Sequence, residues 1–72
     1  MKEVSITGPY ITLGQLLKKE GHVSTGGEFK FFVLEHPLKV NGESEQRRGK
    51  KLYPGDTIEI TDQVNYKVVK SV

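Results

Sequence analysis

The sequence predicts an α+β fold, with two short N-terminal helices packed on a small antiparallel sheet. Between residues 12 and 36 the apolar residues repeat at helical spacing, and from Leu38 onward they alternate with polar residues, as in half-buried strands. The chain has 72 residues, a length that suits one domain with a compact core. We therefore expect residues 1–72 to form a single domain.

Local signals predict the first two elements. Apolar and polar residues alternate over residues 3–7, which favours a short strand. A helix is expected over residues 12–20, because Thr12 and Gln15 have the spacing of a capping box, in which each side chain satisfies a free backbone N–H. Gly21 stands where helices commonly end.

A second helix is expected directly after the first, so that the two form a tight helical hairpin. Thr25 and Glu28 repeat the capping-box spacing. Phe29 and Phe32 share one helical face and are expected in the core. Pro37 should end this helix, because the residue before a proline avoids the helical conformation.

Turn motifs separate the strands that we expect in the C-terminal half. Asn41-Gly42 is the dipeptide most favoured in a type I′ hairpin turn. Residues 53–56 (Tyr-Pro-Gly-Asp) predict a second turn, with proline at its second position. Strands are expected over residues 57–60, where apolar and polar residues alternate, and over residues 66–69.

Composition excludes several classes of function. The net charge is only +2, and there is no cysteine to form disulfides or thiolate metal sites. His22 and His36 have no carboxylate or cysteine at ligand spacing, and no nucleophile–base pair can be assembled, so we expect no metal, no cofactor and no enzymatic activity. No apolar run is long enough for a signal peptide or a membrane span. We expect a cytoplasmic monomer without a membrane partner.

Positive charge is concentrated in Arg47-Arg48-Gly49-Lys50-Lys51, which we call the basic run. Lys and Arg side chains grouped in this way can neutralise RNA phosphates and release their counterions. The alternative is a solvated loop, which is what most short charge runs are. The residues alone leave both interpretations open.

Four stretches resemble the S4 RNA-binding domain, which occurs in a ribosomal small-subunit protein, in pseudouridine synthases and in bacterial tyrosyl-tRNA synthetases. They are residues 11–18 (Ile-Thr-Leu-Gly-Gln-Leu-Leu-Lys), 26–30 (Gly-Gly-Glu-Phe-Lys), 40–43 (Val-Asn-Gly-Glu) and 54–58 (Pro-Gly-Asp-Thr-Ile). The double glycine and residues 47–56 are more similar to the small stand-alone YaaA-type S4 proteins of bacteria. Each motif is short, and the order and spacing of all four make the match specific.

This resemblance implies an S4 fold with its alpha-L motif, and a module that binds RNA without catalysis. Such a module would recognise structured RNA, such as ribosomal RNA or a ribosome-assembly intermediate, through a basic surface. Its partners would be that RNA or the ribosome. With the charge pattern, the resemblance nominates these RNA-binding residues: Lys18, Lys19, Thr25, Gly26, Gly27, Lys30, Asn41, Arg47, Arg48, Lys50 and Lys51.

Gly26 and Gly27 stand at the start of the second expected helix, where exposed N–H groups and the helix dipole suit a phosphate. Lys30 lies one turn onward on the same face, so we expect these three residues and the basic run to form one anion-binding surface. The glycines could instead simply ease the turn between the helices. Many S4 domains have an arginine in this first turn, so the RNA contacts of this chain are expected to differ in detail.

Two other functions fit part of the sequence. β-grasp sulfur carriers are similarly short and can contain Val-Asn-Gly-Glu, but they need a C-terminal Gly-Gly, and this chain ends Lys70-Ser71-Val72. The other alternative is a protein-interaction module with a fortuitously basic loop. A salt-sensitive RNA shift would separate that module from an RNA-binding one.

Overall fold

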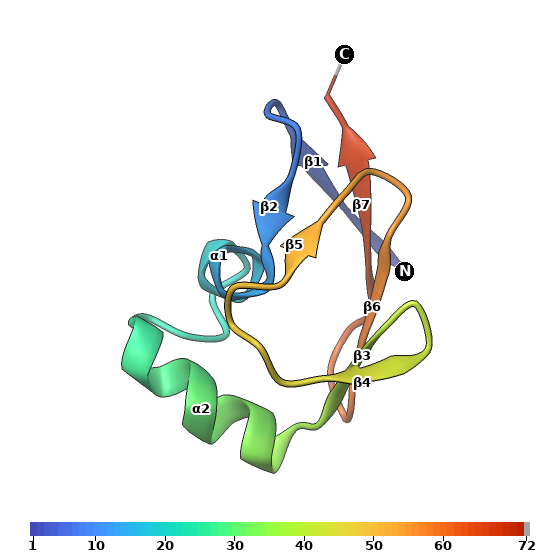
Figure 1. Ribbon diagram of the computed structural model, residues 1–72. Coiled ribbons are helices and arrows are strands. Elements are labelled where there is room, and N and C mark those ends of the chain that lie inside the picture. The colour runs from blue at the N-terminus through green and yellow to red at the C-terminus, as the bar shows by residue number, and fades with distance from the viewer. Residues whose placement is uncertain (72) are drawn as a thin grey trace.

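Two helices and seven strands follow one another in the computed structural model, which describes residues 1–71 (Figure 1). In chain order these elements are β1 (Lys2–Ile6), β2 (Ile11–Thr12), α1 (Leu13–Lys19), α2 (Gly26–Glu35), β3 (Leu38–Val40), β4 (Glu43–Glu45), β5 (Lys51–Leu52), β6 (Thr57–Ile60) and β7 (Tyr66–Lys70).

Five of the strands form one mixed sheet in the order β1-β7-β6-β3-β4. Neighbours from β7 to β4 are antiparallel, but β1 runs parallel to β7, with Val4 opposite Val68. The prediction of an antiparallel sheet is therefore wrong for the first strand. Parallel strands need a long connection, and here both helices and the strands β2 to β6 lie between β1 and β7 along the chain.

The strands β2 and β5 form a separate two-stranded ladder, which no sequence pattern predicts. Ile11 lies opposite Leu52, and Thr12 lies opposite Lys51. Strands of two residues are too short to show an alternating pattern. The ladder brings the end of the basic run to the start of α1.

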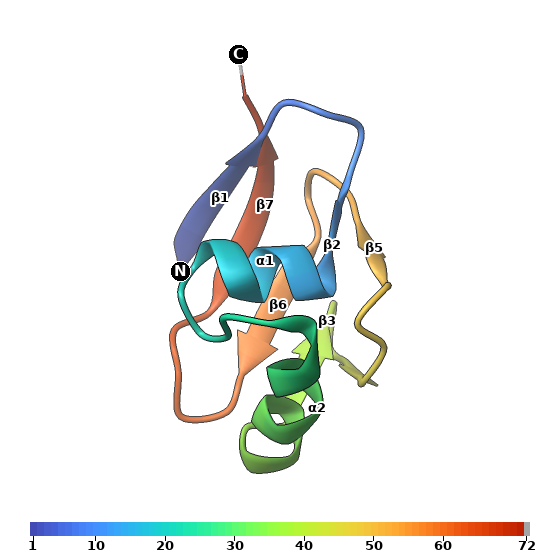
Figure 2. The ribbon, with the colours of Figure 1, turned by 90° about the vertical axis from the view of Figure 1, so that its left-hand side faces the viewer.

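The helix α1 crosses in front of β1, β7 and β6, whereas α2 lies at the end of the molecule near β3 (Figure 2). The side chains of Leu13, Leu16 and Leu17 on α1 are fully buried and share one apolar core with Ile58 and Val68 of the sheet. Neither helix within residues 1–71 is long and apolar enough to cross a membrane.

Both ends of α1 have the predicted form. The N–H of Gln15 donates to the hydroxyl of Thr12 at 3.2 Å, and the N–H of Thr12 donates to the Gln15 side-chain oxygen at 2.9 Å, which confirms the capping box. Gly21 has a φ of 82° and its N–H donates to the carbonyl of Lys18 at 3.1 Å. This left-handed conformation is the reason that glycine suits the helix end.

The start of α2 differs from the prediction. Thr25 is the N-cap residue, but its side chain makes no capping hydrogen bond, so the second capping box is wrong. The N–H of Glu28 donates instead to the main-chain oxygen of Thr25 at 3.2 Å. Phe29 is buried as predicted, while Phe32 is only partly buried against the core. The helix ends two residues before Pro37.

The two predicted turns are confirmed. Asn41 and Gly42 have φ values of 52° and 84°, the left-handed pair that a type I′ turn requires. In the second turn Gly55 has a φ of 100°, and the N–H of Asp56 donates to the carbonyl of Tyr53 at 2.9 Å. The first turn joins β3 and β4, which pair in the sheet, and the second leads from β5 of the small ladder to β6 of the sheet.

Candidate nucleic-acid interface

The backbone of the basic run is anchored on the start of α1. The N–H of Leu13 donates to the carbonyl of Lys50 at 2.8 Å, and the N–H of Gly14 donates to the carbonyl of Arg48 at 2.9 Å. The first N–H groups of a helix have no partner within it, so these carbonyls satisfy two of them. The run is consequently held beside α1 at a fixed position.

The side chain of Arg47 forms an ion pair with a neighbouring carboxylate. Its Nε and Nη2 donate to the two oxygens of Glu45 at 2.9 and 3.1 Å, and its main-chain N–H donates to the same side chain at 3.0 Å. Hydrogen bonding by Arg47 lowers the pKa of Glu45 to about 2. This pair was not predicted from the sequence, although Glu45 stands only two residues before Arg47. The charge of Arg47 is therefore balanced locally by Glu45.

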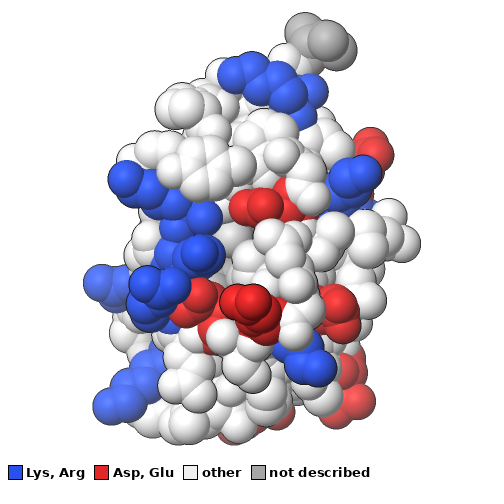
Figure 3. Space-filling view, turned by 45° about the vertical axis from the view of Figure 1, so that its right-hand side comes forward, with Lys and Arg blue, Asp and Glu red and all other residues white. Residues whose placement is uncertain are grey.

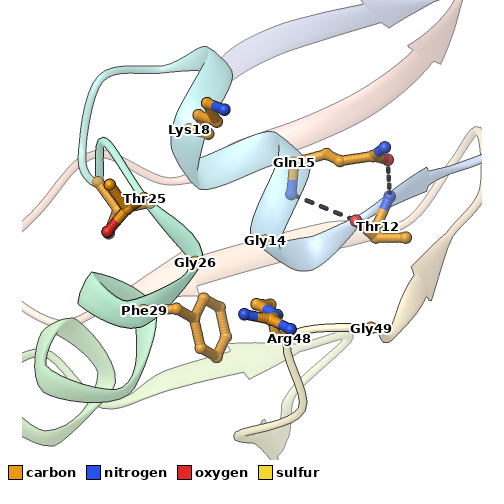
Figure 4. A pocket seen from close by; sticks show the side chains of 10 residues that line it. Thr12, Gly14, Gln15, Lys18, Thr25, Gly26, Phe29, Arg48 and Gly49 are labelled. Atoms are coloured by element: carbon orange, nitrogen blue, oxygen red, sulfur yellow. Dashed lines mark hydrogen bonds between the residues drawn. The ribbon is translucent and has the colours of Figure 1, made fainter.

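Arg48 lies between the two helices, over Gly14 of α1 and Gly26 of α2 (Figure 4). A Cβ atom on Gly14 would lie 2.5 Å from Cγ of Arg48, and one on Gly26 would overlap its Nη1. Within residues 1–71 the guanidinium of Arg48 takes part in no hydrogen bond or ion pair. Two glycines thus leave room for an arginine whose donors are unused, in contrast to the adjacent Arg47.

A cavity of about 220 Å³ lies where α1, α2 and the basic run meet (Figure 4). The buried side chains of Val23 and Phe29 contribute apolar lining. Lys18, Thr25 and Arg48 contribute polar groups. Gly26, Phe29 and Arg48 also line a second hollow that contains Lys30. The structure therefore brings five of the nominated residues together: Lys18, Thr25, Gly26, Lys30 and Arg48.

The end of the basic run continues this surface toward β2. The ammonium of Lys51 lies 5.0 Å from the ring centroid of Tyr10, within the range of a cation–π interaction. Tyr10 also packs beside Tyr53, with 6.0 Å between their ring centroids. Both tyrosines are exposed and flank the basic run on the β2–β5 side.

Three nominated residues lie outside both this group and the basic run. The ammonium of Lys19 donates to the carbonyl of Ser5 at 2.9 Å, on the side of α1 that faces β1. Asn41 is occupied in the β3–β4 turn, because its side-chain oxygen accepts from the N–H of Thr57 at 2.9 Å and its amide donates to Asp56 at 3.0 Å. Gly27 lines neither cavity, and a Cβ there would meet only the Thr25 hydroxyl, at 3.9 Å.

Lys and Arg side chains gather along one edge of the face drawn in Figure 3, although the net charge is only +2. In Figure 3, Lys and Arg side chains follow one another down the left edge of the molecule, while acidic side chains gather beside them in the middle of this face. Such a row of cations along one edge can attract a polyanion.

Both histidines contact other groups of the fold. Nε2 of His22 lies 2.6 Å from the hydroxyl of Tyr66, and burial lowers the pKa of His22. Nδ1 of His36 lies 3.2 Å from the carbonyl of Thr61. Within residues 1–71, no three His, Asp or Glu side chains are grouped so that they could hold a metal ion.

Comparison with known proteins places this architecture in a family. The model of the S4 domain family matches residues 4–69. The chain is 46% identical over 66 residues to the protein named "Probable ribosome maturation protein RlbA" of Bacillus subtilis (strain 168), which covers 92% of this chain and 93% of that protein. It is 36% identical over 50 residues to the protein named "Putative RNA-binding protein YbcJ" of Escherichia coli (strain K12), which covers 69% of this chain and 71% of that protein. These matches support the predicted resemblance and not the β-grasp alternative. The chain belongs to the S4 domain family.

Proposed function

We propose that the chain is a single RNA-binding domain that recognises structured RNA through one basic surface, formed by Lys18, Thr25, Gly26, Lys30, Arg48, Lys50 and Lys51. The observation that carries this proposal is the position of Arg48, whose free guanidinium is held at the junction of α1, α2 and the basic run. The basic surface is positively charged, and its backbone is anchored by hydrogen bonds to α1. An anchored cluster of cations suits phosphate binding better than a mobile loop does.

The relatives' names indicate which RNA to test first. One relative is named for ribosome maturation and another for RNA binding. Ribosomal RNA, or a precursor present during ribosome assembly, is therefore the RNA that we propose. We further propose that the protein acts as a cytoplasmic monomer by binding alone, without turnover of the RNA.

The test measures RNA affinity as a function of salt. The probe is fragmented bacterial ribosomal RNA, end-labelled and measured by filter binding. Changing Lys50 and Lys51 together to Ala should reduce the slope of log affinity against log salt by about 1.4 to 1.8, which is about 0.7 to 0.9 for each phosphate that the protein no longer neutralises. The variants should remain folded, because substitutions at surface positions usually change stability by about 0.5 kcal/mol or less.

A matched control removes the same charge elsewhere. Lys39 on β3 and Lys67 on β7 are exposed, and each stands between two buried neighbours, so their side chains leave the sheet on the face away from the core. Changing both to Ala should leave the slope unchanged. If the two double variants lose affinity equally, only net charge attracts RNA and the proposed surface is wrong.

Exposed apolar side chains on α2 favour a second candidate, a protein-interaction module. Phe31 and Leu34 are 69% and 68% exposed, and their spacing places them side by side on the helix. Changing both to Ser leaves RNA affinity intact if the first proposal is correct. A wild-type protein that binds no RNA at low salt would leave this second candidate as the better one.

A further inference from the structure

We propose that the cavity between α1, α2 and the basic run receives one unstacked nucleobase of the bound RNA, and that Arg48 is the residue that holds it. This inference rests on the proposed function and goes further, because it assigns a separate subsite for a base within a surface that otherwise contacts phosphates.

The size and lining of the cavity fit a single base. Its volume is about 220 Å³, below the roughly 300 to 1,000 Å³ of sites that enclose a whole small ligand. Val23 and Phe29 are 5% and 4% exposed, and they give the cavity an apolar part. A nucleobase has an apolar face and a polar edge, and proteins that recognise single-stranded RNA bind the faces of splayed-out bases. A phosphate alone would leave the apolar lining without a partner.

Without RNA, the side chain of Arg48 already lies between the two helices. Its aliphatic part lies against Gly14 and its guanidinium lies at Gly26, where any larger residue would displace it. A side chain that already lies in its binding position needs less rearrangement on binding. The planar guanidinium can stack on a base or donate to its edge, and its donors have no partner within residues 1–71.

Two further groups suit the nucleotide that carries this base. Thr25 lines the cavity and its hydroxyl makes no capping hydrogen bond, so a rotation of this side chain would offer the hydroxyl to the polar edge of a base. Lys18 lines the same cavity from α1 and is exposed, so its ammonium can reach the phosphate next to the base. These groups lie on different elements and converge on one space.

The first experiment moves Arg48 without changing any charge. Gly26→Ala places a methyl group on the site of the guanidinium, and because that end of the side chain is flexible it can move away without unfolding the protein. Gly14→Ala displaces the same side chain from the other helix, but its methyl group would also lie 3.3 Å from the main-chain oxygen of Arg48, so this variant disturbs the backbone of the basic run as well. Each variant should weaken binding of the ribosomal RNA fragments by about 5- to 150-fold, the value of stacking one base. Gly27→Ala is the control, since its methyl group meets nothing closer than 3.9 Å.

Melting temperatures of the variants show whether a loss of RNA binding results from unfolding. Alanine is a better helix former than glycine, so Gly26→Ala and Gly27→Ala should both melt at or above the wild-type temperature. If Gly26→Ala binds RNA as tightly as Gly27→Ala does, the position of the Arg48 side chain has no role in binding and the inference is wrong.

The second experiment separates a base from a phosphate. Amide spectra of the full chain labelled with ¹⁵N are recorded with adenosine monophosphate, cytidine monophosphate or ribose 5-phosphate at equal millimolar concentrations. We expect the amides of Gly26, Phe29 and Gly49 to shift more with the nucleotides than with ribose 5-phosphate. Equal shifts with ribose 5-phosphate would identify a phosphate site, and no shift with any of the three would overturn the subsite. In either case RNA binding by the wild-type protein would keep the proposed function, whereas loss of RNA binding itself would remove both.

Discussion

Two adjacent arginines should differ sharply in what they contribute to RNA binding. The guanidinium of Arg47 is bound to Glu45 through hydrogen bonds of 2.9 and 3.1 Å. Arg48 has no such partner and lies over Gly14 and Gly26. By sequence the two residues are equivalent members of the basic run, so their comparison tests whether the tertiary arrangement decides function.

The perturbation must account for Glu45. Arg47→Ala alone would expose a negative charge beside the basic surface and weaken RNA binding by repulsion. The double variant Glu45→Gln with Arg47→Ala removes the ion pair and leaves its net charge at zero. We expect this double variant to bind RNA as the wild type does. Arg48→Ala removes a guanidinium that has no acidic partner within residues 1–71 and one of the side chains that line the cavity. It should weaken RNA binding by about 5- to 150-fold.

Filter binding at several salt concentrations, together with thermal melting, measures both effects. Arg48→Ala should leave the free energy of unfolding within about 0.5 kcal/mol of the wild-type value, since its side chain is exposed and makes no hydrogen bond within residues 1–71. The reasoning is refuted if Arg48→Ala binds RNA as well as the wild type, or if the charge-neutral double variant loses as much affinity as Arg48→Ala does.

Three further predictions concern stability. Glu45 has a pKa of about 2 in the folded protein, below its ordinary 4.5, so its pair with Arg47 stabilises the fold above about pH 4.5 and this contribution is lost as the pH falls toward 2. Acid titrations followed by circular dichroism should show a shallower decline for Glu45→Gln, and identical curves would contradict the pairing. Burial lowers the pKa of His22 below 6.5, so stability should fall as the pH decreases from 6.5, because the unfolded chain takes up the proton first. Urea unfolding at several pH values should lose this slope in His22→Gln, and a slope that persists would assign it to another group. Thr12→Ala should lower the free energy of unfolding by about 1 kcal/mol, because it removes the hydroxyl that caps α1. An unchanged urea midpoint would show that the cap adds nothing.

Local elements of this fold could be predicted because their causes lie within a few residues. The capping box of Thr12 and Gln15, the left-handed Gly21 and the Asn41-Gly42 turn all depend on contacts between near neighbours. The second capping box failed for an equally local reason. The main-chain oxygen of Thr25 occupied the N–H that its hydroxyl was expected to bind.

The sequence predicted which residues contribute to the candidate site, and the structure corrected which of them lie together. The sequence identified the basic run, and the structure places Lys18, Thr25, Gly26 and Lys30 with Arg48 beside it. The sequence could not separate these residues from Asn41 or Lys19, because exposed polar side chains bind whichever groups the fold brings near them. Their actual partners come from elements distant along the chain.

By itself, the sequence determined the family, the helix starts and ends, the turns, and a concentration of positive charge between residues 47 and 51. Only the tertiary structure decided that β1 pairs in parallel with β7, that β2 pairs with β5, and that Arg48 rather than Arg47 presents a free guanidinium. The physical reason is the same in each case. Caps and turns depend on bonds between residues a few positions apart, which leave a pattern in the sequence. Strand pairing and the fit of Arg48 over Gly14 and Gly26 depend on steric contacts across the fold, which arise only when the whole chain has packed around its core.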